Sequence, residues 1–537
     1  MMVHHQYYGG RVSGPTTTMY LTLALHRAVQ LYPHRIAVRF GQREHQFTQF
    51  KDRVARLASA LQSLGMCEGD RVAMLALNSD RYLEYLMAVP WGGGVLNPCN
   101  IRWSVGEIAY ALNDSGSSIL LVDDTFAPLV SQLREQAGIL RDVIYCGEGE
   151  TPAGMHGYEQ ILAKAMPVED AVRRGEDLAG IFYTGGTTGF PKGVMLSHNN
   201  MCASGLALRA EGMARPGSVY LHAAPMFHLA DIGLSMPHWL EGSTHVIIPA
   251  FNPELLLDTI ARHRVTHTLL VPTMIQMTVD HPGIKTPRDL SSLELIVYGA
   301  SPISEPVLER AMATLPGVGF AQAYGMTELA PLATVNPASN HTLEGRKLGK
   351  LRAAGRASFC IDLRIVDAFG REVPRGAVGE VVVRGPNVMQ GYWNKPEQTA
   401  QAIRDGWMHT GDGAWMDEDG YIFITDRLKD MIISGGENIY SAEVENIVAQ
   451  HPAVAACAVI GIPSEQWGET VHAVVVCHAG SSATADELIA HCKALIAHYK
   501  CPRSIEFREA LPISGAGKVL KTRLREPFWR GHLRHVA

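Results

Sequence analysis

The sequence has no CxxC pair among its nine cysteines, and nine is an odd number. A disulfide framework or a cysteine-based zinc site needs paired or regularly spaced cysteines, so we expect reduced thiols and neither kind of site. The nine are Cys67, Cys99, Cys146, Cys202, Cys360, Cys457, Cys477, Cys492 and Cys501.

Long apolar runs and long basic blocks are also missing. No uninterrupted apolar stretch reaches the roughly 18 residues that a membrane span needs, and the first 19 residues contain no apolar core of the signal-peptide kind. With a net charge of −6 and no basic block, the chain offers no footprint for nucleic acid. We therefore expect a cytoplasmic protein with no transmembrane segment and no nucleic-acid partner.

What is present suits a large globular protein. The 537 residues predict two to four domains, and 47% hydrophobic residues with 19% charged residues are enough for a large core. In the segment 47–65 apolar residues recur every three or four positions, as on one face of a helix that ends at Gly65. They are Phe50, Val54, Leu57, Leu61 and Leu64.

Strand and helix signals alternate up to about residue 355. Buried strands are predicted at 71–77, 118–124, 245–251, 267–272 and 293–299, with helical segments between them. This alternation predicts an α/β fold with parallel sheets covered on both faces. From about 355 to 426, short strands between Gly/Pro turns predict a small barrel-like β unit.

We expect the chain to be divided as follows. Residues 1–18 form a flexible extension, and 19–426 form a large N-terminal domain of two doubly wound βα subdomains plus the β-rich subdomain at about 355–426. Residues 427–430 form a hinge, and 431–537 form a small mobile α+β domain.

The loop TGGTTGFPKG at 184–193 follows the apolar run LAGIFY. It is not a P-loop, because Lys192 follows Pro191 and is followed by Gly193 where Ser or Thr would bind magnesium. Its glycines can still turn backbone N–H groups toward an anion, and its threonines and Lys192 add hydroxyls and charge. An ordinary glycine turn is the alternative reading.

The chain as a whole resembles the adenylate-forming superfamily, which comprises acyl- and aryl-CoA synthetases, luciferases and the adenylation domains of peptide synthetases. Among these it is most similar to bacterial fatty-acyl-CoA ligases. Six stretches in family order carry the resemblance: YTGGTTGFPKGVMLSH at 183–198, PMFH at 225–228, YGASPI at 298–303, QAYGMTE at 322–328, WMHTGD at 407–412 with DRLKDMIISGGENIY at 426–440, and PISGAGK at 512–518.

The resemblance implies an ATP site. Residues in the positions of the family's phosphate loop are Thr184, Gly185, Gly186, Thr187, Thr188, Gly189 and Lys192. Those in the positions that hold the adenine are Gly299, Ala300, Ser301, Gln322, Ala323, Tyr324 and Gly325. Asp412 and Arg427 match the ribose contacts. Thr327 and Glu328 match the α-phosphate and Mg²⁺ contacts, and oxygen donors of this kind suit Mg²⁺.

The resemblance also implies roles in the chemistry. Lys518 matches the lysine that bridges the acid's carboxylate and the α-phosphate, which makes Lys518, Thr327, Glu328 and His228 the predicted catalytic set. The predicted acyl pocket comprises His228, Ala230, Ile232, Gly299, Pro331 and Leu332. The predicted CoA contacts are Gly435, Gly436, Trp467 and Tyr499, with Cys501 where some relatives have a phosphate-binding arginine, and Lys429 is the predicted hinge residue.

The implied reaction makes an acyl-AMP from an acid and ATP, with Mg²⁺, and then a thioester with CoA. Ala230 is small where hydroxycinnamate ligases carry tyrosine, which favours a medium- to long-chain or branched fatty acid over an aryl acid. Two different functions stay open: delivery of the acyl group to a carrier protein, and a non-catalytic nucleotide sensor. The complete catalytic set disfavours the sensor, and we also consider a homodimer.

Overall fold

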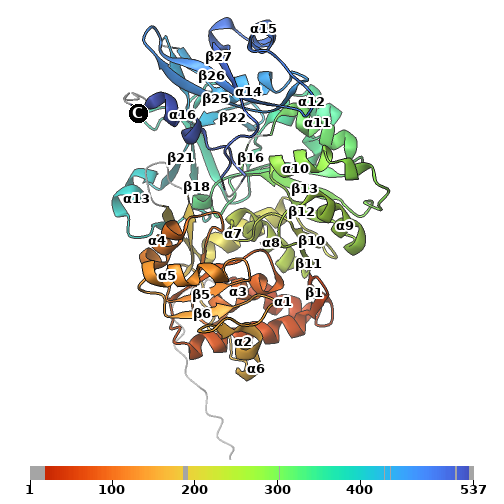
Figure 1. Ribbon diagram of the computed structural model, residues 1–537, viewed down its shortest axis with the longest axis vertical. Helices are drawn as coiled ribbons and strands as arrows, with labels where there is room; N and C mark the ends of the chain where they lie inside the picture. The colour runs from red at the N-terminus through yellow and green to blue at the C-terminus, as the bar shows by residue number, and fades with distance from the viewer. Residues whose placement is uncertain are drawn as a thin grey trace, which may run out of the picture.

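The computed structural model describes residues 19–184, 191–301, 303–427, 430–435, 437–514 and 517–530, without the side chain of Arg427. These residues form four sheets. In Figure 1 the C-terminal sheet and its helices form the blue part of the chain, next to the green helices α10 to α12. None of the described helices is long and apolar enough to cross a membrane.

The eight-stranded sheet is mainly parallel, and apart from β19 its strands lie between residues 71 and 197. Its strands, in spatial order, are β19 (Gly391–Tyr392), β9 (Lys192–Ser197), β8 (Leu178–Thr184), β4 (Val95–Pro98), β3 (Arg71–Leu75), β5 (Ile119–Val122), β6 (Asp142–Tyr145) and β7 (His156–Gly157). Its helices are α1 (Leu23–Leu31), α2 (Phe47–Ser63), α3 (Asp80–Trp91), α4 (Val105–Ser115), α5 (Val130–Gln136), α6 (Tyr158–Lys164) and α7 (His198–Ala210).

The nine-stranded sheet has five consecutive parallel pairings, from β1 to β14. In spatial order its strands are β16 (Arg356–Ala357), β15 (Thr334–Asn336), β14 (Gly319–Tyr324), β13 (Leu295–Gly299), β12 (His267–Leu269), β10 (Val219–His222), β11 (Thr244–Ile247), β1 (Ile36–Phe40) and β2 (Arg43–Gln46). Its helices are α8 (Leu229–Glu241), α9 (Pro253–His263), α10 (Pro272–Val279), α11 (Glu305–Thr314) and α12 (Leu343–Lys347).

Two smaller sheets follow. The first is antiparallel and comprises β17 (Asp362–Val366), β18 (Gly379–Arg384), β20 (Ile403–Arg404), β21 (Trp407–Met416) and β22 (Ile422–Arg427), with α13 (Pro396–Ala402) beside it. The second belongs to the C-terminal domain and comprises β23 (Ile432–Ser434), β24 (Glu437–Ile439), β25 (Val454–Ser464), β26 (Gly468–Cys477) and β27 (Ser504–Phe507). Its helices are α14 (Ser441–Val448), α15 (Ala485–Leu495) and α16 (Lys521–Trp529).

The helices of the two large sheets share one core. Phe50 of α2 stacks on Trp239 of α8 with ring centroids 5.3 Å apart, and both side chains are almost fully buried. The apolar face predicted for the segment 47–65 is the buried face of α2, and Gly65 follows it with a φ of +89°. The predicted fold class is confirmed: parallel α/β sheets are followed by a separate C-terminal domain whose sheet is mainly antiparallel.

Candidate active site

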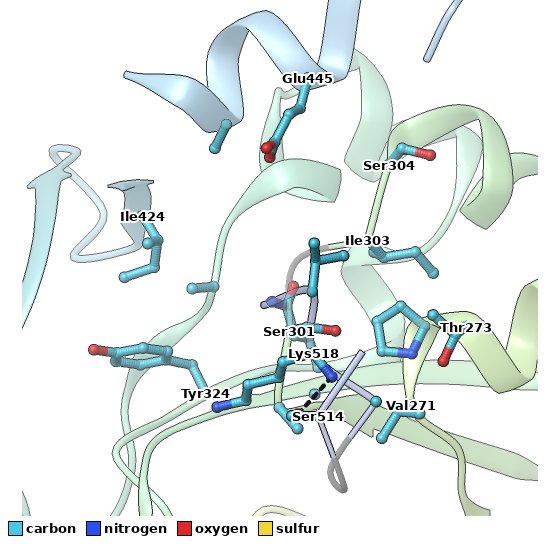
Figure 2. Close-up of a pocket in the computed structure, with 18 of the residues that line it drawn as sticks. Val271, Thr273, Ser301, Ile303, Ser304, Tyr324, Ile424, Glu445, Ser514 and Lys518 are labelled. Carbon is cyan, nitrogen blue, oxygen red and sulfur yellow. Dashed lines mark hydrogen bonds between the residues drawn. The ribbon is translucent and has the colours of Figure 1, made fainter. Parts of the chain in front are cut away.

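A cleft of about 2280 Å³ lies between the strand ends of the nine-stranded sheet and the C-terminal domain (Figure 2). It brings together residues that the motifs place far apart in sequence. Those predicted to bind ATP that line it are Thr184, Gly299, Ala300, Ser301, Gln322, Ala323, Tyr324, Gly325, Thr327, Glu328, Asp412 and Lys518. Gly185, Gly186, Thr187, Thr188 and Gly189 fall outside the described residues.

The carboxyl ends of β13 and β14 form one wall of this cleft. The two strands run parallel with Gly299 opposite Ala323, as expected for a ligand site beyond the ends of parallel strands. A Cβ on Gly299 would lie 2.2 Å from the carbonyl oxygen of Ala323, and one on Gly325 would lie 1.8 Å from that of Pro331. Only glycine permits such close packing of the backbone at both positions.

Tyr324 and Asp412 connect the nine-stranded sheet to the antiparallel sheet beside it. The Tyr324 hydroxyl donates a hydrogen bond of 2.8 Å to Oδ2 of Asp412, which is 7% exposed. Asp412 is opposite Arg427 in the β21–β22 pairing. The predicted adenine and ribose residues therefore lie at one place in the fold.

Glu328 lies beside the strand that follows the glycine-rich loop. Its Oε1 accepts a 2.9 Å hydrogen bond from the hydroxyl of Tyr392, and β19, which contains Tyr392, pairs with β9, where Lys192 begins the strand. The Lys192 ammonium lies 5.0 Å from the centroid of the Tyr392 ring. Lys192 does not line the cleft, but Tyr392 links it to the predicted Mg²⁺ ligand.

Lys518 enters the cleft from the C-terminal domain on a turn that the large domain contacts. Ser514 Oγ accepts a 3.0 Å hydrogen bond from the Lys518 N–H, and the Ser514 carbonyl accepts one of 3.0 Å from Nη1 of Arg102. Gly517, with a φ of +75°, packs so closely that an added Cβ would lie 3.1 Å from Val271. Figure 2 shows the Lys518 side chain extending toward Tyr324.

His228 and Lys518 are electrostatically coupled. Burial, together with the positive charge of Lys518, lowers the pKa of His228 to about 4. His228 Nδ1 accepts a 3.2 Å hydrogen bond from the N–H of Ala230, which leaves the proton of the neutral ring on Nε2. At neutral pH the ring is therefore a neutral hydrogen-bond donor beside a cation.

Beyond His228 the cleft is apolar. Its lining there comprises Leu208, Ala230, Leu234, Leu269, Val297, Pro331 and Leu332. Ile232, which was also predicted to line the acyl pocket, is 3% exposed, packs in the core and does not line this cleft. Ala230 and Leu234 are one helical turn apart and share a face of α8, whereas a residue two positions after Ala230 points to the other side.

Comparison with known proteins identifies the family to which the chain belongs. The family described as AMP-binding enzyme matches residues 25–393, and the AMP-binding enzyme C-terminal domain matches 443–518. The chain belongs to the AMP-binding enzyme family. This confirms the resemblance derived from the six motifs, and the chain is an AMP-forming acid–thiol ligase of the ATP-dependent acyl- and aryl-CoA ligase group.

Three relatives of this AMP-binding enzyme illustrate the range of the family. A feruloyl-CoA synthase of Amycolatopsis sp. is 42% identical over 94% of this chain and 98% of the relative. The medium/long-chain-fatty-acid–CoA ligase FadD8 of Mycobacterium tuberculosis is 35% identical over 91% of this chain and 86% of its own. ATP-bound MatB from Rhodopseudomonas palustris superposes with a TM-score of 0.84 at 30% identity, covering 94% of this chain and 99% of its own.

Three of the four residues predicted to contact CoA are described by the structure, and they contact other parts of the C-terminal domain or solvent. Gly435 donates a 2.9 Å backbone hydrogen bond to Trp467, and the Arg503 guanidinium lies 4.8 Å from the centroid of the Trp467 ring. Tyr499 is 44% exposed. None of Gly435, Trp467 and Tyr499 lines the cleft, and Gly436 and Lys429 fall outside the described residues.

Two residues of this AMP-binding enzyme were missed by sequence reasoning. Tyr392 joins Glu328 to Lys192, and Arg102 holds the Lys518 turn. Tyr392 sits in a two-residue strand, too short to give an alternating pattern, and Arg102 is an exposed arginine in a loop. Neither feature predicts a site from the sequence alone, because each depends on a partner far along the chain.

Proposed function

We propose that this AMP-binding enzyme activates an apolar carboxylic acid with ATP and transfers the acyl group to CoA, with an aryl acid of the cinnamate type as its first candidate substrate. The observation that supports this most directly is the apolar end of the cleft, which opens next to His228 and Lys518. An acid bound there would direct its carboxylate toward the cation and leave its tail among apolar side chains.

The side chains around this point suit the adenylation step. Two unit charges about 4 Å apart repel by about 1 kcal/mol even in water, so the approach of a carboxylate to a phosphate needs a fixed cation. Lys518 would supply it by contacting both groups, while the neutral His228 would orient the carboxylate through its Nε2–H. Pyrophosphate would then leave toward the glycine-rich loop.

Glu328 and Thr327 fit Mg²⁺ by the chemistry of their donors. A carboxylate and a hydroxyl are hard oxygen ligands, and Mg²⁺ is commonly held by one or two carboxylates together with substrate phosphates. Both residues line the cleft, and Tyr392 holds the Glu328 carboxylate in place. When bound, Mg²⁺ would neutralise phosphate charge.

The substrate class rests on the relatives and on the lining. The feruloyl-CoA synthase is 42% identical to this chain and the fatty-acid ligase FadD8 is 35% identical, which favours the aryl acid. The small Ala230 and the aliphatic residues around it, including Leu234 and Leu269, make a medium-chain fatty acid the second candidate.

A panel of aryl, straight-chain and branched acids tests the proposal. Pyrophosphate release is measured for each acid with ATP and Mg²⁺, both with and without CoA. We expect one or a few hydrophobic acids to give sustained release only when CoA is present. No release with any acid would contradict the adenylation step, and equal release without CoA would contradict CoA as the acceptor.

A further inference from the structure

One side of helix α8 carries a buried carboxylate that plays no part in the proposed chemistry. Asp231 lies in the first turn of α8 and is 1% exposed. Its Oδ2 is 2.6 Å from Nδ1 of His222, and its Oδ1 accepts a 3.1 Å hydrogen bond from the Tyr220 hydroxyl. Both partners belong to β10, so α8 is joined to the nine-stranded sheet by polar contacts within the core.

These contacts continue to the next strand. His222 Nε2 is 2.9 Å from Nδ1 of His245 on β11, and the His245 ring stacks on Trp239 of α8 with centroids 3.9 Å apart. Burial, with the neighbouring histidines, holds the pKa of His245 well below its ordinary value, so this ring is neutral. His245 can then donate to His222 and His222 to Asp231, leaving the charge of Asp231 held by two donors.

Attaching a helix through a buried carboxylate carries a free-energy penalty. Removing a charge from water carries a penalty of several kcal/mol that its partners only partly offset, and apolar residues of similar size often stabilise a core as well or better. Such a group fixes a geometry in a way that apolar contacts do not, because hydrogen bonds are directional.

Asp231 lies on α8 next to residues that line the pocket. Ala230 and Leu234 line the apolar end of the cleft, and His228 precedes the helix as its N-cap residue. His238, two turns after Asp231, stacks on Tyr220 with centroids 4.4 Å apart and thus packs against the same strand. Asp231 and His238 therefore pack α8 against β10, next to the face of the helix that forms a wall of the acid pocket.

We infer that Asp231, acting through His222 and His245, is a positioning residue that fixes the wall of the acid pocket and thereby determines which acids the enzyme accepts. This inference rests on the proposed function. It predicts a defect confined to the acid, because none of the residues assigned to ATP or CoA belongs to α8. If the helix is free to rotate or shift, acids of different size should be distinguished less well.

The test compares the unaltered protein with Asp231→Asn and Asp231→Leu. We expect Asp231→Leu to raise KM for the preferred acid by about 10-fold, the lower end of what one apolar contact contributes in a pocket, while KM for ATP and kcat change less than about two-fold, as for a loss of uniform binding. Discrimination between two acids that differ by one methylene, typically about 10- to 200-fold in apolar pockets, should fall toward unity. Asp231→Asn, whose amide oxygen can still accept a hydrogen bond from His222, should keep part of the selectivity that Asp231→Leu loses.

Two matched variants provide the controls. Ser235→Ala on the same helix removes a hydroxyl that donates to the Ile232 carbonyl, and it should leave KM for the acid unchanged. His222→Asn should reproduce the loss of selectivity, with no further loss in the double variant with Asp231→Leu, because the two residues act as one unit. Circular dichroism and a thermal melt identify folded variants.

An unchanged KM and selectivity in folded Asp231→Leu and His222→Asn would overturn the inference. So would a fall in kcat with no change in KM for the acid, which is the result expected of a purely structural residue. Failure of the proposed function would look different: the unaltered protein itself would then show no acid-dependent release of pyrophosphate, and that result would overturn both.

Discussion

Arg102 of the large domain donates a hydrogen bond of 3.0 Å from Nη1 to the carbonyl oxygen of Ser514 in the C-terminal domain, 412 positions further along the chain. Ser514 in turn holds the N–H of Lys518 through its hydroxyl. A second contact between the domains is the 2.7 Å hydrogen bond from Gln276 Nε2 to the Ala455 carbonyl. The C-terminal domain is thus held in a position that keeps Lys518 in the cleft.

We predict that Arg102→Ala will slow adenylation but leave thioester formation from added acyl-adenylate unchanged, because it removes a contact that holds the Lys518 turn. A loss of about ten-fold in acid-dependent pyrophosphate exchange corresponds to about 1.4 kcal/mol, which is reasonable for a hydrogen bond from a charged group. Arg134→Ala is the matched control: Arg134 also donates to a backbone carbonyl, that of Gly154, but within the large domain. Equal effects of the two variants would contradict the prediction.

Lys518→Ala should impair pyrophosphate exchange far more. A fixed donor at a developing charge contributes on the order of 10²- to 10³-fold to the rate, whereas conversion of supplied acyl-adenylate to thioester needs no such bridge and should persist. The two half-reactions are measured separately, and Lys493→Ala, which alters an exposed lysine of the same domain, serves as control. If both half-reactions fell equally, the assigned role of Lys518 would be wrong.

Arg503→Ala tests the predicted CoA contacts. Cys501 is 2% exposed and its thiol lies 3.6 Å from the Ala497 carbonyl, so it cannot replace the phosphate-binding arginine of some relatives. Two cations are close in sequence: Lys500 is paired with Glu443, and Arg503, which packs over Trp467, is the one that this variant removes. Losing a charged hydrogen bond of about 1.5–3 kcal/mol should raise KM for CoA by about ten-fold or more, without affecting pyrophosphate exchange.

The control for that experiment is Arg508→Ala, because Arg508 follows a few residues later in the same domain and pairs with Glu506. An unchanged KM for CoA in Arg503→Ala, measured on protein that still adenylates, would place the nucleotide of CoA elsewhere.

The fold could be predicted because it depends on local patterns of apolar residues. The residues of the candidate site were predicted from six motifs that resemble a family, and two glycines of those motifs, Gly299 and Gly325, stand where the backbone packs too closely for a Cβ. The contacts of Asp231 could not be predicted. Its partner His222 lies on β10 and His245, which contacts His222, lies on β11, and nothing local to any of the three residues indicates that they meet.

Ile232 was predicted to line the acyl pocket, whereas Leu234 of the same helix lines the cleft. Both residues are apolar, and which of them faces the cleft depends on how α8 is rotated by its contacts with the rest of the fold. A sequence pattern fixes the period of a helix but not its rotation when, as in α8, nearly every side is buried.

Buried histidines should make the protein less stable as the pH falls. Burial lowers the pKa of His198 to about 4, with smaller effects from nearby charges, and burial also lowers the pKa of His267 and His341 to about 4. An unfolded histidine has a pKa of about 6.5, so between about pH 6.5 and 4 the unfolded state binds more protons than the folded state. The stabilising effect is therefore complete above about pH 6.5 and is lost progressively toward about pH 4.

His198→Asn isolates one of these contributions. His198 Nδ1 accepts a 3.2 Å hydrogen bond from the N–H of Leu21, which an asparagine oxygen can also accept, and the ring is 1% exposed. The free energy of unfolding, measured with urea at about pH 7.5 and about pH 5, should fall less in His198→Asn than in the unaltered protein, with an upper limit of about 1.4 kcal/mol for each pKa unit of separation. His34→Asn, which alters an exposed histidine, should lose as much stability as the unaltered protein. If the change between these two pH values were the same in all three proteins, His198 would not titrate as its burial requires.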